Sequence, residues 1–236
     1  MDGVYETRLT LKSRDVDPYQ NIRLSKLAEL LQEASIAHTE ELGFDRTKTL
    51  DKGLLWVIIQ QRLQIRRLPR YDETVVVKSW PGEMMHVLFP RYYQVETEAG
   101  EVLVRSSALW MLISSETRGM IFPEQWGVII GGVTTGEEIP LPETVQPLEC
   151  HSSATLNVGF SLCDLNGHMN NTRYFDLAAD RIPDFAAGKM PKEIGVQYTS
   201  EARLGTVIRI GTARTENGWA VTGDGEKNIF RMKIVF

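Results

Sequence analysis

The chain has 236 residues, of which 42% are hydrophobic and 24% are charged, and its formal net charge is −5. This is enough globular sequence for one large domain or two of about 100 residues each. The acidic balance disfavours nucleic-acid binding, which needs a basic face. No apolar run approaches the roughly 18 residues of a membrane helix, and the two cysteines lack disulfide-framework or metal-ligand spacing. The N-terminus shows neither a secretory nor a transit signal, so we expect a cytoplasmic protein without membrane contact.

The first half begins with strict alternation, which predicts a strand over 5–12. An apolar stripe at three- and four-residue spacing then predicts a helix over 24–42, which Gly43 is placed to end. Segments rich in Val, Ile, Tyr and Trp, separated by turn residues, predict four strands over 55–66, 73–80, 85–97 and 101–113. Residues 123–147 contain several glycines and prolines and predict a linker.

The second half repeats this order. A strand is predicted near 153–162 and a helix over 171–187, which Pro183 should kink or end early. Asn217-Gly218 predicts a tight hairpin within a run of four strands near 192–200, 204–215, 219–224 and 227–236. The repetition predicts an internal duplication with a first domain over 1–122 and a second over 148–236.

The two halves can be aligned by residue, with 15–21 on 164–170 and 67–74 on 199–206. In this register the second half carries three polar residues that differ from their counterparts in the first half: Asn166, His168 and Glu201, opposite Asp17, Tyr19 and Pro69. A purely structural turn would have less reason to differ at these positions. We therefore expect one site per chain, formed by the second half and completed by the first.

The chemically suggestive residues Asp164, Asn166 and His168 are spaced two apart. In an extended segment all three side chains would project to one face. Asn170 could cap the following helix, whose free N–H groups can hold a developing oxyanion. The simpler alternative is a turn in which Asp and Asn satisfy their own backbone. A metal is disfavoured, because an EF-hand loop would need a carboxylate where Phe175 stands, so we expect neither a metal nor a cofactor.

Four segments carry a resemblance to a known family: 164–174 (Asp-Leu-Asn-Gly-His-Met-Asn-Asn-Thr-Arg-Tyr), 197–202 (Gln-Tyr-Thr-Ser-Glu-Ala), 33–38 (Glu-Ala-Ser-Ile-Ala-His) and 55–57 (Leu-Trp-Val). The first closely resembles the catalytic motif of plant-type acyl-ACP thioesterases, and the second resembles their motif of Glu-Tyr, two residues, then Glu-Cys. The others look like that family's first half. The resemblance covers essentially the whole chain and implies an α+β tandem (double) hot-dog fold, each half a long helix wrapped by an antiparallel β-sheet. Gln197 and Ala202 depart from a glutamate and a cysteine, so activity here would not require a thiol at 202.

The same resemblance implies hydrolysis of a fatty acyl thioester on acyl carrier protein, with release of the free acid. We expect Glu201 and His168 to activate water, with Glu201 preferred as the general base, although the two could exchange roles. Asn166 would polarise the carbonyl together with backbone N–H groups at the helix start. Asp164 would orient His168 or its neighbours, and no covalent acyl-enzyme is expected.

The acyl tail is expected mainly in the first half, near Trp56, for which plain core packing is the alternative. Asn170 is assigned to substrate binding as well. Arg62 and Arg66 belong to a group of four arginines in nine residues. This group could receive the acidic carrier protein or its phosphopantetheine arm, or simply be a solvated strand face. His38, within the helix stripe, is expected to be a hydrogen-bonded core histidine.

Three other functions stay open. The nearest is a hydrolase that acts on acyl-CoA, and a non-catalytic acyl-binding hot-dog module belongs to a different class. A hydratase or dehydratase on the same fold is disfavoured by the match to thioesterase motifs. Duplication supplies within one chain the pairing that single hot-dog units take from a dimer, so the protein could be a monomer or a homodimer.

Overall fold

The computed structural model describes residues 3–236. Its first half contains one long helix and five strands: β1 (Tyr5–Thr10), α1 (Leu24–Glu41), β2 (Leu54–Ile65), β3 (Thr74–Pro81), β4 (Leu88–Thr97) and β5 (Val102–Ser114). Its second half contains two short helices and five strands: β6 (His151–Asn157), α2 (Arg173–Ala179), α3 (Pro183–Ala186), β7 (Glu193–Tyr198), β8 (Val207–Thr215), β9 (Gly218–Asp224) and β10 (Asn228–Val235). The elements agree with the sequence prediction to within a few residues at most boundaries.

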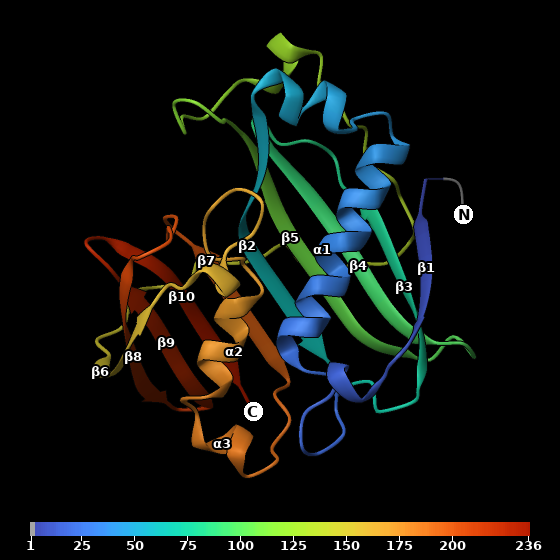
Figure 1. Cartoon of the computed structure of the whole chain (residues 1–236). Coiled ribbons are helices and arrows are strands. Elements are labelled where there is room, and N and C mark those ends of the chain that lie inside the picture. The colour runs from blue at the N-terminus through green and yellow to red at the C-terminus, as the bar shows by residue number, and fades with distance from the viewer. Residues whose placement is uncertain (1–2) are drawn as a thin grey trace.

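All of these strands form one antiparallel sheet in the order β1-β3-β4-β5-β2-β7-β10-β9-β8-β6 (Figure 1). The order within the first half is repeated in the second, and the halves join edge to edge where β2 pairs with β7, with Gln60 opposite Gln197 and Arg62 opposite Gly195. This junction pairs two edges that would otherwise expose unpaired backbone groups. The α+β double hot-dog fold implied by the sequence resemblance is confirmed.

Helix α1 crosses the face of the first five strands (Figure 1). It buries Leu27, Leu31, Ala34 and His38 at three- and four-residue spacing, as the stripe predicted. The helix of the second half is shorter and divided. Pro183 opens α3 after an extended Ile182, because proline cannot supply the N–H that would continue α2.

The segment between β5 and β6 runs over the sheet without strands of its own. It is fastened by Ser107 Oγ, which donates to the Pro140 carbonyl, and by the Val145 N–H, which donates to Gln197 Oε1 (3.1 Å). Gln197, which differs from the glutamate of the family motif, thus anchors the connection between the halves. No helix within residues 3–236 is both long and apolar enough to cross a bilayer.

Candidate active site

The segment that carries Asp164, Asn166 and His168 is a tight turn. The Asp164 N–H donates to the His168 carbonyl (2.9 Å), and the Gly167 N–H returns to the Asp164 carbonyl (3.0 Å). Asp164 Oδ1 accepts the Asn166 N–H (2.8 Å), and Gly167 has φ 76°, a left-handed conformation that glycine adopts without strain. The simpler alternative, a turn whose aspartate satisfies its own backbone, is therefore the conformation found, because Gly167 and the Asp164 side chain fold the chain back on itself.

The first half contains the same turn. Asp17 N–H donates to the Asn21 carbonyl (2.8 Å), Gln20 N–H donates to the Asp17 carbonyl (3.0 Å), and Asp17 Oδ1 accepts the Tyr19 N–H (2.8 Å). Gln20 even takes the left-handed φ of 67°. Asp17, and not Asp15, is therefore the counterpart of Asp164, and the predicted register is two residues out.

The second aligned segment is also out of register, by one residue. The Ile22 N–H donates to the Pro69 carbonyl, and the Met169 N–H donates to the Ala202 carbonyl, both at 2.8 Å. Pro69 is thus equivalent to Ala202, and the residue before it, Leu68, is equivalent to Glu201. The corrected counterparts of Asn166, His168 and Glu201 are Tyr19, Asn21 and Leu68. The first half still has neither the imidazole nor the second carboxylate.

The turn and the segment after β7 bring His168 and Glu201 together. Glu201 Oε1 lies 3.8 Å from His168 Nε2, and the two segments are joined by a bridge between His168 and Arg203. The other ring nitrogen, Nδ1, lies 3.4 Å from the Met169 carbonyl and 3.9 Å from Asp164 Oδ2. His168 is only 8% exposed, so its Nε2 edge faces Glu201 from a fixed position.

A residue that no sequence motif marks completes this cluster. Arg118 lies in the turn that follows β5 in the first half, with its Nη1 3.2 Å from Glu201 Oε1. Its backbone has φ 56°, and its N–H donates to the Ser114 carbonyl (3.0 Å). Strained backbone of this kind tends to persist where the surroundings hold a functional side chain. Arg203 adds a longer contact of 3.6 Å from a mostly exposed side chain.

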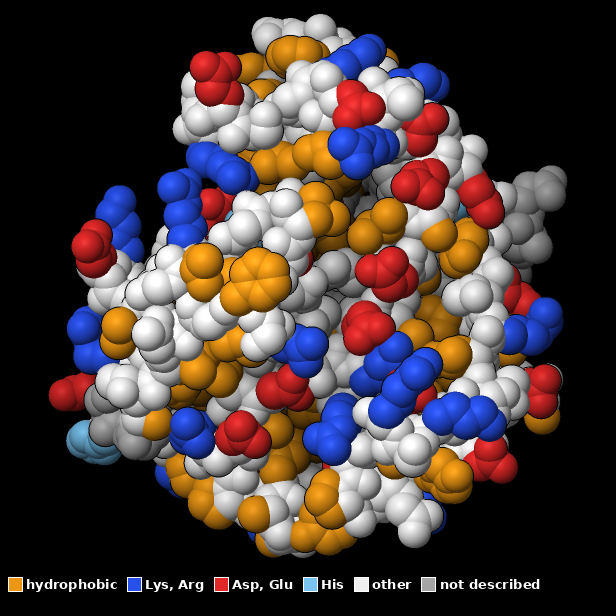
Figure 2. Space-filling model, viewed as in Figure 1, with side chains coloured by type: hydrophobic (Ala, Val, Ile, Leu, Met, Phe, Trp, Pro, Cys, Tyr) orange, Lys and Arg blue, Asp and Glu red, His pale blue; other side chains and the backbone are white. Residues whose placement is uncertain are grey.

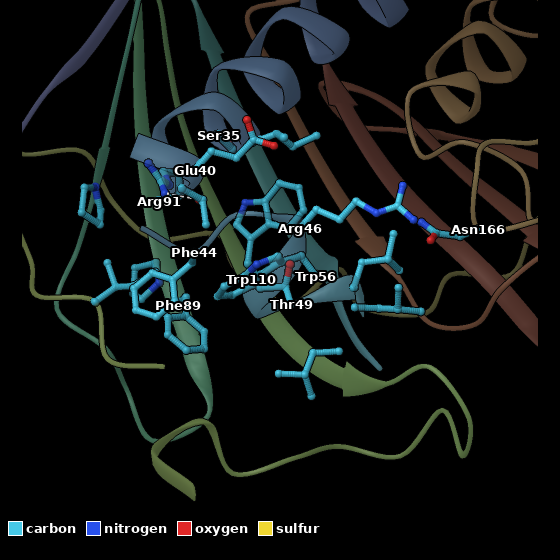
Figure 3. A pocket seen from close by; sticks show the side chains of 18 of the residues that line it. Ser35, Glu40, Phe44, Arg46, Thr49, Trp56, Phe89, Arg91, Trp110 and Asn166 are labelled. Atoms are coloured by element: carbon cyan, nitrogen blue, oxygen red, sulfur yellow. Dashed lines mark hydrogen bonds between the residues drawn. The ribbon is translucent and has the colours of Figure 1, made fainter. Parts of the chain in front are cut away.

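The turn borders a cavity of about 360 Å³ that lies mainly in the first half. Most of its lining is apolar, including Trp56, whose ring meets Phe89 edge-on at a centroid distance of 4.8 Å. Leu165 and Asn166 contribute the wall from the second half, and Figure 3 shows the Asn166 side chain at one side of the cavity. Figure 2 shows hydrophobic side chains around a recess on the upper part of the same face of the molecule.

The side-chain amide of Asn166 is free to act in this cavity, because it makes no hydrogen bond to any residue of the described chain 3–236. The backbone N–H of Asn166 and that of Gly167 are both used within the turn. Helix α2 starts only at Arg173, so the expected group of free N–H donors directly behind His168 is not formed. The side-chain amide of Asn166 is thus a donor that lines the cavity without a partner in the described residues.

Burial also determines the protonation state of two tyrosine hydroxyls near the turn. It raises the pKa of the Tyr174 hydroxyl, and the nearby Asp164 carboxylate adds to this shift. Burial likewise raises the pKa of Tyr198, whose hydroxyl donates to the Asn171 carbonyl (3.2 Å). Both phenols therefore stay protonated at neutral pH and serve as packing under the site.

Two other predicted site residues, Asn170 and Arg62, make contacts within the protein, and a third, Arg66, is exposed. Asn170 Oδ1 accepts the N–H and hydroxyl of Thr172 (2.9 and 2.8 Å), so it fixes the entry to α2. Arg62 pairs with Glu193 (2.9 Å) where the halves join, and Arg66 is exposed just beyond β2. The fold brings carboxylates from other segments onto two of the four arginines, since Glu193 pairs with Arg62 and Glu101 lies 3.8 Å from Arg67. A contact of Arg66 with a carrier stays a prediction.

The family model for the acyl-ACP thioesterase N-terminal domain matches residues 2–123, and that for the C-terminal domain matches residues 145–234. A chloroplastic dodecanoyl-[acyl-carrier-protein] hydrolase of Cinnamomum camphora is 25% identical over 227 residues, which cover 87% of this chain and 58% of the relative. The chain thus spans a little more than half the length of the curated relatives it matches.

Two solved structures share the complete fold. An acyl-ACP thioesterase from Bacteroides thetaiotaomicron superposes with a TM-score of 0.83 at 19% identity, covering 100% of this chain and 98% of the other. The 12:0-ACP thioesterase from Umbellularia californica superposes with a TM-score of 0.81 at 21% identity, covering 100% and 97%. At these identities the likeness establishes the shared fold.

Proposed function

Because the chain belongs to the acyl-ACP thioesterase family, we propose that it hydrolyses the thioester of a fatty acyl group on acyl carrier protein and releases the free acid. The carrier protein is then the partner and the acylated phosphopantetheine arm the part that enters the site. The observation that carries the proposal is the approach of Glu201 Oε1 to His168 Nε2 (3.8 Å) at the same turn whose Asn166 lines a largely apolar cavity of about 360 Å³.

In this mechanism a water molecule lies against Glu201 and His168. The 3.8 Å separation between Oε1 and Nε2 is too long for a direct hydrogen bond and allows one water to contact both. Glu201 accepts the proton while the water oxygen attacks the carbonyl carbon. The amide of Asn166 donates to the oxyanion that forms. When the C–S bond breaks, the departing thiolate takes back the proton, and the carboxylic acid leaves the cavity.

Asp164 has a positioning role in this scheme. Its Oδ1 holds the turn through the Asn166 N–H, as Asp17 does in the first half. Its other oxygen lies 3.9 Å from His168 Nδ1, where a carboxylate favours an imidazole with its proton on that nitrogen. We assign the acyl tail to the cavity near Trp56.

The test is an assay in which the purified chain cleaves acyl-ACPs of graded acyl length. The free thiol that is released measures the rate. His168→Ala and Glu201→Ala should each lower kcat roughly 10²- to 10⁴-fold, the usual worth of a positioned acid or base. His151→Ala and Glu98→Ala remove an exposed histidine and an exposed glutamate elsewhere and serve as matched controls. Circular dichroism and melting temperature should be unchanged in all four.

Two outcomes would overturn the proposal. Wild-type protein that binds acyl chains but cleaves no thioester would be an acyl-binding module. Near wild-type turnover by both His168→Ala and Glu201→Ala would mean that other residues carry the reaction. Running the same chain lengths on acyl-CoA separates the two carriers, and faster cleavage of acyl-CoA would replace acyl carrier protein as the partner.

A further inference from the structure

The wall of the cavity contains a buried cation without a carboxylate. Arg91 on β4 lines the cavity, yet its side chain belongs to a residue that is only 5% exposed. Its hydrogen bonds go to neutral acceptors: His38 Nδ1 (2.8 Å), Thr39 Oγ1 (2.8 Å) and Ser79 Oγ (3.4 Å). No ion pair within residues 3–236 includes Arg91, and burial lowers the pKa of its guanidinium.

His38 cannot supply the missing negative charge. Burial, reinforced by the charge of Arg91, lowers the pKa of His38 to about 4, so the imidazole is neutral at physiological pH. In that state Nδ1 accepts from Arg91. This confirms the expectation of a hydrogen-bonded core histidine. It leaves the guanidinium without an ion-pair partner among residues 3–236, although the exposed Glu40 lines the same cavity.

The donors of Arg91 are not all used. A guanidinium has five N–H groups, and the three hydrogen bonds to His38, Thr39 and Ser79 use two on Nη1 and one on Nη2. The Nε–H and the second Nη2–H have no protein partner in the described chain. The three bonds explain how Arg91 ties the end of α1 to β3. They do not explain a charge, since a neutral amide could make similar contacts.

Arg91 lies at the end of the cavity that is remote from Asn166, where the thioester carbonyl is proposed to bind. Figure 3 shows Arg91 and Asn166 at opposite sides of the cavity, with Trp56 and Trp110 between them. The indole Nε1 of Trp56 is also buried without a hydrogen-bond partner. An acyl chain whose carbonyl meets Asn166 and whose tail follows this wall would bring its far portion to Arg91.

We propose that the cavity accepts an acyl chain that carries an oxygen function at its far end, and that Arg91 binds this oxygen. A terminal carboxylate fits best, because it supplies the missing countercharge and accepts two hydrogen bonds from one guanidinium. A terminal hydroxyl is the weaker partner. A plain methyl end would leave the buried charge and its free donors unsatisfied. The assignment rests on the proposed function for the thioester end of the ligand.

The primary test needs only wild-type protein. Thioesters of plain, ω-hydroxy and ω-carboxy acyl chains are compared at each even length from octanoyl to tetradecanoyl. At the length that spans from Asn166 to Arg91, kcat/KM for the ω-carboxy chain should exceed that for the plain chain by roughly 10- to 100-fold, the usual worth of a hydrogen bond to a charged group. A plain chain that is equal or better at every length would overturn the proposal.

Variants locate the effect. Arg91→Gln keeps a donor for His38 and removes the charge, so the preference for the carboxylate should disappear while plain chains are still cleaved. Arg46 also lines the cavity but is largely exposed and pairs with Asp51 (2.9 Å), so Arg46→Gln should keep the preference. If Arg46→Gln loses it instead, the assignment to Arg91 is wrong. If Arg91→Gln does not fold, the wild-type panel decides.

A binding measurement separates failure of this inference from failure of the proposed function. Calorimetry with methyl decanoate and monomethyl decanedioate presents the same chain with an uncharged ester at one end, and it requires no hydrolysis. The half-ester should bind at least roughly tenfold tighter. If no thioester is cleaved but the half-ester binds more tightly, the proposed hydrolysis is wrong and the binding of an oxygen function by Arg91 is supported. If thioesters are cleaved but the half-ester binds no more tightly, the hydrolysis is supported and the role of Arg91 is wrong.

Discussion

The contact between Arg118 and Glu201 gives a sharp test of how the halves cooperate. Arg118 comes from the first half and Glu201 from the second, and their side chains are 30% and 25% exposed at a separation of 3.2 Å. We predict that Arg118→Gln lowers kcat/KM because the carboxylate is no longer held beside His168. Arg118 would then be a positioning residue, since it acts through Glu201 and not on the substrate.

The size of the effect follows from the geometry. Fully exposed ion pairs contribute about 0–1 kcal/mol, while groups in one contact network couple by about 0.5–3 kcal/mol. Because this pair has intermediate exposure, we expect an interaction free energy of about 1–2 kcal/mol between Arg118 and Glu201. A loss of that size corresponds to a decrease of roughly 5- to 30-fold in kcat/KM. Arg118→Lys keeps the charge but not the planar fork, so it should recover part of the loss.

The assay is a double-mutant cycle on acyl-ACP hydrolysis with Glu201→Gln as the second change. If Arg118 acts through Glu201, Arg118→Gln should cost almost nothing further once the carboxylate is gone. Arg105→Gln, which breaks the exposed pair with Glu137 (2.9 Å), is the matched control and should leave kcat/KM unchanged. Equal losses in both backgrounds, or a faster Arg118→Gln enzyme, would refute the reasoning.

Three further predictions concern single positions. Asn166→Ala should lower kcat roughly 10²- to 10³-fold in single-turnover measurements without changing the melting temperature, as expected for a lost oxyanion donor. The pKa of His38 is about 4 in the folded protein and about 6.5 when unfolded. Urea titrations should therefore show wild-type stability falling, relative to His38→Gln, as pH drops from about 6.5 to 4. Gly167→Ala meets open space but forces a left-handed residue, so it should cost about 1–2 kcal/mol in unfolding free energy, against little for Gly159→Ala.

The sequence predicted the strands and helices well because their signals are local. Alternation, the α1 stripe and turn residues lie within each element, and Pro183 marked the break between α2 and α3. The register between the halves was predicted wrongly for an equally physical reason. The first half contains Asp15 and Asp17, and only the hydrogen bonds of the turn reveal that Asp17 holds it, while Asp15 Oδ2 accepts the Lys12 N–H.

Residues whose role depends on distant partners could not be predicted. Arg62 looked free because no acid lies near it in sequence, yet β7 brings Glu193 against it. Arg91 looked like one more strand residue, and its burial against His38 and Thr39 appears only once α1 lies over β4. Arg118 had no signal at all. In each case the decisive contact joins residues separated by more than fifty positions.

The corrected register separates what the duplicated turn needs from what only one copy uses. The aspartate is present in both halves, and it makes the same bond to the backbone two residues later, so its first role is to build the turn. Histidine and glutamate occur only in the second half, although Asn21 and Leu68 fit the same backbone positions in the first. The turn does not require them. These two side chains lie within 4 Å of each other, at the turn whose Leu165 and Asn166 line a cavity supplied mainly by the other half. Because the fold does not require them, their presence calls for a chemical explanation.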